Sequence, residues 1–139
     1  RLFDDRNLVV VSHSTGFVEP NLQQLTEENR SAIKKAGATI LTCQHAFGGV
    51  NRAVRKKLGT YLTDEIIAYT LRTFGEGMKV CAEIALMAAD AGLVTVGDPC
   101  VAVAGTGRGA DTAVVLTPAN AQQFFDLRIM EILAKPRLS

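Results

Sequence analysis

Short apolar runs alternate along this chain with segments that have the spacing and capping residues of helices, and this alternation restricts the fold most. The segment Asn7–Ser12 ("NLVVVS") holds a continuous apolar run of the type buried in parallel sheets. Further strands are expected at Ala38–Cys43, Cys100–Ala104, Thr112–Leu116 and Leu127–Leu133.

Helical segments lie between these strands. The segment Thr26–Gly37 begins with a capping threonine and two glutamates and ends with two lysines and a glycine, which suits the helix dipole at both ends. A basic helix is expected near Val50–Leu58, and Thr63 is expected to cap the next one. Glycines at 75 and 77 should break that helix before a mostly apolar helix over Lys79–Ala91.

This order of elements predicts an α/β sandwich with a mainly parallel sheet and an antiparallel pairing near the C-terminus. The sequence contains no repeat and no linker-like stretch, so residues 1–139 are expected to form one domain.

Composition excludes several classes of function. The chain is 47% hydrophobic and 21% charged, with a net charge of +1, which does not favour nucleic acid as a partner. It holds no apolar run long enough to span a bilayer and no secretory signal, so no membrane partner is expected. The three cysteines are far apart and lack the spacing of zinc ligands or a disulfide scaffold, which favours a reducing, cytoplasmic setting.

The stretch "VAVAGTGRGADTAVVL" (Val101–Leu116) places three glycines, Gly105, Gly107 and Gly109, between two expected strands. A dinucleotide fingerprint requires a helix after its glycines, because the helix N-terminus holds the pyrophosphate. The sequence therefore does not predict a Rossmann-type site here. A strand–loop–strand site for an anion stays open.

Three loops should leave the carboxyl edge of the sheet, where open α/β sheets bind ligands. They are Ser12–Phe17 ("SHSTGF"), Cys43–Val50 ("CQHAFGGV") and Gly105–Asp111 ("GTGRGAD"). Both histidines of the chain, His13 and His45, fall in these loops directly after strands. This convergence predicts a composite ligand site.

Each candidate also has a plainer interpretation. His13 and His45 could be structural and bond a loop carbonyl, and without a third ligand at recognisable spacing they do not predict a metal site. Ser12, Ser14 and Thr15 offer hydroxyls to an anion but are also common turn residues. Arg108 suits phosphate or carboxylate, or is an exposed loop arginine.

Other polar or reactive side chains are explained without chemistry. The basic cluster Arg52, Arg55, Lys56 and Lys57 is either a solvated helix face or a source of positive potential near the second loop. Cys43 is expected to be a small buried side chain. Glu83 lies four residues after Lys79, so a local ion pair accounts for it.

Four stretches carry a family resemblance: "HSTGF", "GEGMKVCAEIALMAADAGLV", "GTGRGADTAVVLTPAN" and "FDLRIMEILAKPR". Together they resemble a family of small prokaryotic proteins related in fold to the C-terminal α/β domain of pyruvate kinase. The resemblance covers essentially the whole chain. Members of the family run longer at the N-terminus, so we expect an N-terminal βα unit to be missing from this sequence.

The resemblance implies a three-layer α/β/α sandwich that lacks the catalytic barrel of pyruvate kinase, so pyruvate kinase activity is not expected. It also implies a phosphorylated ligand, with flavin mononucleotide (FMN) as a candidate cofactor. From the spacing of the histidines, no metal is expected. The ligand-binding residues that it carries over are Ser12, His13, Gly16, Phe17, His45, Gly105, Thr106, Gly109, Ala110 and Asp111. The turn residues Ser14, Thr15, Gly48, Gly49, Gly107 and Arg108 complete the candidate site.

Two hypotheses of function follow from these residues. In the first, the chain is a binding module for a phosphorylated small molecule. In the second, it is an enzyme that acts on a flavin or a phosphorylated metabolite, with His13 or His45 as general acid or base. The apolar helix near Val80–Ala89 and the missing unit further predict a homo-oligomer.

Overall fold

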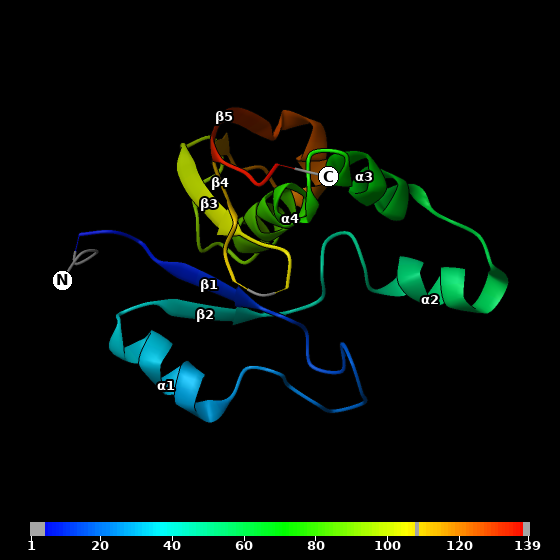
Figure 1. Ribbon diagram of the computed structural model, residues 1–139, viewed down its shortest axis with the longest axis horizontal. Helices are drawn as coiled ribbons and strands as arrows, with labels where there is room; N and C mark the ends of the chain where they lie inside the picture. The colour runs from blue at the N-terminus through cyan, green and yellow to red at the C-terminus, as the bar shows by residue number, and fades with distance from the viewer. Residues whose placement is uncertain (1–4, 108, 138–139) are drawn as a thin grey trace. The chain divides into compact units, whose positions relative to one another are not determined.

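The structure, a computed structural model, describes residues 5–107 and 109–137 of the chain. It divides into two compact units, of which unit 1 ends at His45 and unit 2 begins at Ala46. Each unit contains its own sheet (Figure 1). The described part of the chain is therefore of mixed α/β type, and each unit is considered by itself.

Unit 1 is built from a parallel pair of strands and a helix. Strand β1 (Val9–Ser12) pairs with β2 (Thr39–Thr42), with Val9 opposite Thr39 and Ser12 opposite Thr42. Helix α1 (Glu27–Lys35) connects them. The hydroxyl of Thr26 accepts a hydrogen bond from the backbone amide of Asn29 at 3.2 Å, which confirms the expected cap of this helix.

Unit 2 begins with three helices. Helix α2 spans Val50–Leu58, as expected, and α3 spans Thr63–Arg72. The capping position of α3 is Leu62, and Thr63 is its first helical residue, so the expected threonine cap is wrong. Helix α4 (Glu76–Asp90) starts earlier than expected because Gly75, with a φ of 119°, turns the chain just before it.

The sheet of unit 2 is antiparallel. Its strands are β3 (Cys100–Ala104), β4 (Thr112–Thr117) and β5 (Arg128–Ala134), in the order β3-β4-β5, and a 3-10 helix η1 (Ala121–Asp126) precedes β5. The β4–β5 pairing shifts register at two points, between Ala113 and Val114 and between Val115 and Leu116. Sequence patterns do not indicate η1.

The antiparallel C-terminal pairing is confirmed, but the parallel share is smaller than the sequence predicts. Within the described residues β1–β2 is parallel, whereas β3–β4 and β4–β5 are antiparallel. The reason is the length of the connections. A parallel pair needs a crossover of about a dozen residues, and the loop between Ala104 and Thr112 is shorter than that.

The core of unit 2 lies between α4 and one face of this sheet. Met78, Cys81 and Ala85 of α4 pack against a row of buried strand residues, which are Ala102, Val114 and Leu116. A second cluster joins α3 and α4 to the chain before α2 and consists of Phe47, Ala68, Ala82 and Leu86. Fully burying one such aliphatic side chain contributes roughly 1.5–3 kcal/mol, so these contacts fix α4 on the sheet.

Candidate functional site

The carboxyl ends of β1 and β2 bring two of the predicted loops together within unit 1. Because the two strands are parallel, Ser12 and Thr42 lie opposite each other at the same edge. Their hydroxyl oxygens are 2.6 Å apart and share a hydrogen bond. The edge thus carries two adjacent hydroxyl groups, of which the sequence reasoning had singled out only that of Ser12.

Both histidines gather around Phe17 at this edge. The rings of His13 and Phe17 stack with centroids 4.3 Å apart, and those of Phe17 and His45 stack at 5.0 Å. The two imidazoles are 5.5 Å apart, so the three rings form a triangle of mutual contacts. His13 is exposed, whereas Phe17 and His45 are half-buried. The predicted convergence of the first loop and His45 is therefore present in unit 1.

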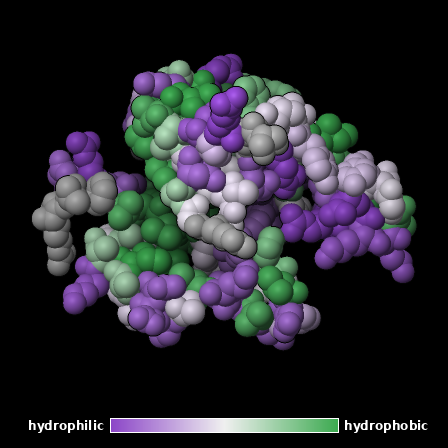
Figure 2. All heavy atoms as spheres, in the orientation of Figure 1, coloured by the Kyte–Doolittle hydropathy of each residue, from purple (hydrophilic) through white to green (hydrophobic). Residues whose placement is uncertain are grey.

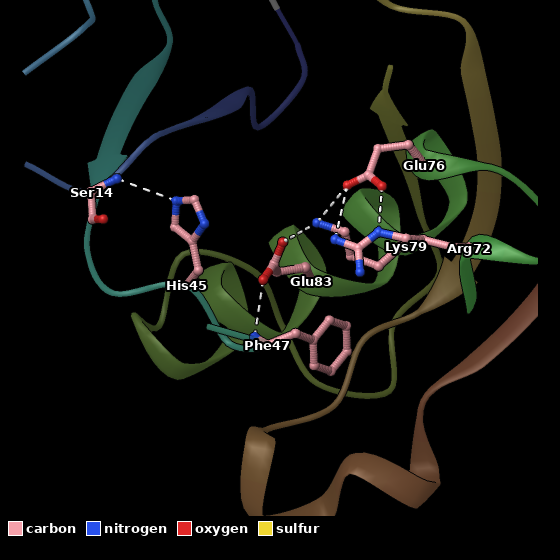
Figure 3. Close-up of polar contacts among 7 residues, drawn as sticks. All are labelled: Ser14, His45, Phe47, Arg72, Glu76, Lys79 and Glu83. Carbon is pink, nitrogen blue, oxygen red and sulfur yellow. Dashed lines mark hydrogen bonds and ion pairs between the residues drawn. The ribbon is translucent and has the colours of Figure 1, made fainter. Parts of the chain in front are cut away.

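In each imidazole, one ring nitrogen forms a hydrogen bond that sets whether that atom donates or accepts. The backbone amide of Ser14 donates to Nε2 of His45 at 3.3 Å (Figure 3). The Nδ1 atom of His13 is 2.6 Å from Oε1 of Gln24. Because an amide oxygen only accepts, Nδ1 of His13 donates in this pair and Nε2 is left as the basic nitrogen of that ring.

Two glutamines brace this loop, and the sequence reasoning missed both. The side-chain amide of Gln23 donates to the carbonyl oxygen of His13 at 2.9 Å, and its oxygen accepts from the backbone amide of Leu25 at 2.8 Å. Gln24 orients the ring of His13. No sequence motif marks a glutamine for this role, and only their position just before the Thr26 cap places them near the loop.

The loop uses several of its own backbone amides. The amide of Gly16 donates to the carbonyl oxygen of Leu22 at 2.9 Å, and the amide of Phe17 donates to the carbonyl oxygen of Ser14 at 3.1 Å. Gly16 has a φ of 84°, a conformation that favours glycine. In this conformation a ligand would be bound by side-chain hydroxyls and imidazoles more than by these amides.

The second predicted loop is divided between the units at His45. In unit 2 the side chain of Phe47 is buried, and its backbone amide donates to Oε1 of Glu83 at 3.0 Å. Gly48 is also buried, and Gly49 is the capping residue of α2 with a φ of 64°. These glycines lead the chain from the core into α2.

Glu83 belongs to a row of alternating charges on α3 and α4 (Figure 3). The ammonium of Lys79 is 3.0 Å from Glu83 and 3.0 Å from Glu76, and Arg72 forms an ion pair with Glu76. Burial acts to raise the pKa of Glu76, but hydrogen bonds from Arg72 and Lys79 outweigh it, so the pKa is lowered. The expected Lys79–Glu83 ion pair is confirmed, and it is the buried end of a larger network whose other members, Arg72 and Glu76, are half-buried.

The third predicted loop, Gly105–Asp111, closes on its own carboxylate. Asp111 accepts from the backbone amide and the hydroxyl of Thr106, and from the hydroxyl of Thr112. Hydrogen bonds from Thr106, followed by that from Thr112, lower the pKa of Asp111. A Cβ atom on Gly105 would collide with the carbonyl group of Gly109, so the turn is closely packed.

This closure changes the interpretation of the glycine loop. The amide and hydroxyl of Thr106 are bonded to a carboxylate, whose negative charge repels a second anion. Gly107 and Gly109 have positive φ and form the turn, and Ala110 is exposed. Arg108 lies outside the described residues. The loop belongs to unit 2, and the histidine cluster belongs to unit 1.

The basic cluster lies on α2, which shows mainly as purple, hydrophilic spheres in Figure 2. Its Arg55 is tied to the buried Glu65 of α3, with Nε and Oε1 2.6 Å apart. The other oxygen of Glu65, Oε2, is buried and has no hydrogen-bond partner among the described residues. This pairing gives Arg55 a structural role.

Among the described residues, histidine, cysteine and acidic side chains nowhere form a group able to hold a metal ion. Within the same residues, no helix has both the length and the apolar character needed to cross a membrane. No model of a known protein family matches this chain. The cluster of His13, Phe17 and His45 is the candidate functional site.

Proposed function

We propose that this chain binds a phosphate-bearing small molecule at the carboxyl edge of β1 and β2. The observation that carries the proposal is the gathering of two imidazoles and two hydroxyls at that edge, from His13, His45, Ser12 and Thr42. Hydroxyls donate to phosphate oxygens, and imidazoles do so with a full charge when protonated. The carboxyl edge of parallel strands is also where open α/β folds bind ligands.

The aromatic triangle favours a ligand that also contains a planar ring. His13 is exposed and stacks on Phe17, so its outer side is available to an aromatic group. FMN combines a planar ring system with a phosphate and is the candidate cofactor. The loop Gly105–Asp111 is not among the proposed phosphate contacts, because its Asp111 carboxylate already accepts the hydrogen bond of the Thr106 amide.

The finer fold assignment is part of the same proposal. The parallel β1–β2 pair with its helix α1 and the antiparallel C-terminal strands support a three-layer α/β/α domain like the C-terminal domain of pyruvate kinase. We further propose that residues 1–139 act as a single domain, that the protein is cytoplasmic, and that it forms a homo-oligomer. Pyruvate kinase activity is not part of the proposal.

A second candidate function is an enzyme in which His13 is the general base. The observation that favours it is the bond between Nδ1 of His13 and Gln24, which holds the ring and leaves Nε2 as the basic atom on an exposed side chain. Bases in enzymes are commonly oriented by a neighbouring group in this manner. The substrate would be the same phosphate-bearing molecule.

A thermal-shift titration tests the binding proposal, with FMN, riboflavin, fructose 1,6-bisphosphate and inorganic phosphate as ligands. A ligand at about 100 times its Kd should stabilise the folded state by roughly 2.7 kcal/mol. Stabilisation by FMN but not by riboflavin would assign the binding energy to the phosphate. If none of the phosphorylated compounds stabilises the protein, the proposal is wrong.

Matched variants locate the site and separate the two functions. Ser12→Ala with Thr42→Val should weaken binding, whereas Thr106→Ala in the other unit should leave the affinity unchanged. If the chain is an enzyme, His13→Ala should abolish turnover while binding is weakened but still measurable, because His45, Ser12 and Thr42 remain. Turnover that persists in His13→Ala would exclude this histidine as the base.

A further inference from the structure

The hydrogen bond between Ser14 and His45 depends on the protonation state of the imidazole. The backbone amide of Ser14 donates to Nε2 of His45 at 3.3 Å (Figure 3). A ring nitrogen accepts a hydrogen bond only through its lone pair, so Nε2 carries no proton in this conformation. The described loop is therefore the form that belongs to the neutral imidazole.

Protonation of His45 converts an acceptor into a donor. The N–H of Ser14 would then face a second N–H, now on a charged ring, and the bond between them would be lost. If the two nitrogens then move apart, both N–H groups can donate to one anionic oxygen, the ring through a charge-assisted bond and the amide through a neutral one. An anion would thus restore the connection that protonation breaks.

Within the described residues of unit 1, two further rings contact His45. His13 is the titratable group that faces it from the β1–α1 loop, with ring centroids 5.5 Å apart, and Phe17 contacts both rings. Glu19 lies farther along the same loop and is exposed. In unit 2, the carboxylate of Glu83 is bonded to Lys79 and accepts a hydrogen bond from the backbone amide of Phe47.

We propose that His45 takes up a proton when the site binds its anion, and that the anion then bridges the Ser14 amide and Nε2 of His45. The proposal rests on the proposed function for the position of the anion. It makes binding proton-linked, so the site is favoured at mildly acidic pH and weakened as the pH rises. His45 acts in this scheme as both ligand and pH sensor.

Sulfate is the probe that isolates this effect, because it stays doubly charged across the range in which imidazoles titrate. Its affinity for the full chain is measured by calorimetry between about pH 5 and pH 8. Uptake of one proton predicts that the affinity falls about tenfold per pH unit on the alkaline side.

Two variants test the role of His45. His45→Gln offers an amide group that does not titrate, so its sulfate affinity should vary less than about twofold over the same pH range. His13→Gln changes the other imidazole of the triangle, and should lower the affinity by a similar factor at each pH while the slope remains. A slope that survives in His45→Gln and disappears in His13→Gln would overturn the assignment.

An NMR titration of the Ser14 amide provides a readout that does not depend on a ligand. Without anion, its chemical shift should follow the titration of the His45 ring and should stay constant in His45→Gln. Sulfate binding whose affinity is independent of pH would overturn this inference and leave the proposed function in place. Absence of sulfate and phosphate binding at every pH would overturn both.

Discussion

Asp111 accepts a hydrogen bond from the backbone amide of Thr106 at 3.1 Å and a second from the hydroxyl of the same residue at 2.6 Å. Its other oxygen accepts from the hydroxyl of Thr112 at 2.6 Å. The carboxylate thus closes the glycine loop between β3 and β4 from within. The amide and hydroxyl of Thr106 therefore both donate to a carboxylate of the same loop.

The Asp111 contacts predict an acid-dependent contribution to stability. The pKa of Asp111 is lowered in the folded protein from its ordinary value of 3.8. Its stabilising contribution is therefore present above that ordinary value and is lost as the pH falls through the lower folded value. Asp111→Asn should be less stable than the native chain at pH 7, and the difference should shrink in strong acid. Urea unfolding of the native chain and the variant, at pH 7 and in strong acid, measures this difference in stability.

The buried Lys79–Glu83 pair predicts a strong effect when one partner is removed. Their side chains are 9% and 6% exposed, and Glu83 also accepts from the amide of Phe47. Glu83→Ala leaves the buried amide of Phe47 without its acceptor and leaves Lys79 paired with Glu76 alone, so it should cost about 3 kcal/mol of unfolding free energy, the lower end of the range for a broken buried pair. Urea unfolding of the purified variant checks this value.

A double variant separates the pair from its surroundings. Lys79→Met combined with Glu83→Leu removes both charges and fills the space, so it should cost less than the sum of the two single replacements. Glu83→Gln keeps an acceptor for Phe47 and should be intermediate. Additive costs would show that the two side chains do not interact.

The close packing at Gly77 predicts that a methyl group there is harmful. A Cβ atom would lie 2.6 Å from Cβ of Thr112 and 2.7 Å from Oδ1 of Asp111. Alanine favours a helix over glycine by about 1 kcal/mol, but the collision should outweigh this gain and destabilise the protein by about 1–3 kcal/mol net. Thermal unfolding of Gly77→Ala measures the result.

Gly92→Ala is the matched control for this collision. Nothing lies within 4 Å of its added Cβ, and its φ of +68° imposes only backbone strain. Its cost should be on the order of 1 kcal/mol. A Gly77→Ala variant as stable as the native chain would contradict the contact between α4 and Thr112.

The environment of Cys81 predicts a thiol that does not react in the folded protein. Burial, and to a lesser degree the charge of Asp111, raise the pKa of Cys81 to about 11. The thiol is therefore neutral at pH 8, and its side chain is enclosed in the core. Iodoacetamide labelling followed by peptide mass spectrometry should modify Cys81 only as fast as the chain unfolds. Rapid labelling in native buffer would contradict the packing of α4.

The helices could be predicted well where short-range chemistry decides their ends. Thr26 caps α1, and α2 spans Val50–Leu58, both as the sequence predicts. The ends of these two helices depend on residues that are close in the sequence. The cap of α3 was misplaced by one residue, since Thr63 followed by acidic residues fits both the capping and the first helical position. The break at Gly75 follows from its positive φ.

Strand pairing and side-chain partners required the tertiary structure. The sequence indicates where β3 and β4 lie, but the length of the intervening loop decides that they run antiparallel. The sequence predicts that His13 and His45 lie at the same edge of a sheet, but it does not predict that their rings are in contact. Gln24 as the partner of His13, and Asp111 as the acceptor for Thr106, depend on loop conformations that residue patterns do not encode.

The two register shifts along β4–β5 bear on how copies of this protein can meet. β5 is the outer strand in the β3-β4-β5 order, and its Met130, Ile132 and Leu133 are at least 44% exposed. A flat strand with such side chains would act as a template for a foreign strand. Each bulge interrupts the regular spacing of main-chain groups that a new partner would need, and charges at Arg128 and Glu131 discourage stacking. Any association between copies of the chain should therefore use side-chain packing on a face, and fibril-like growth from this edge should be slow.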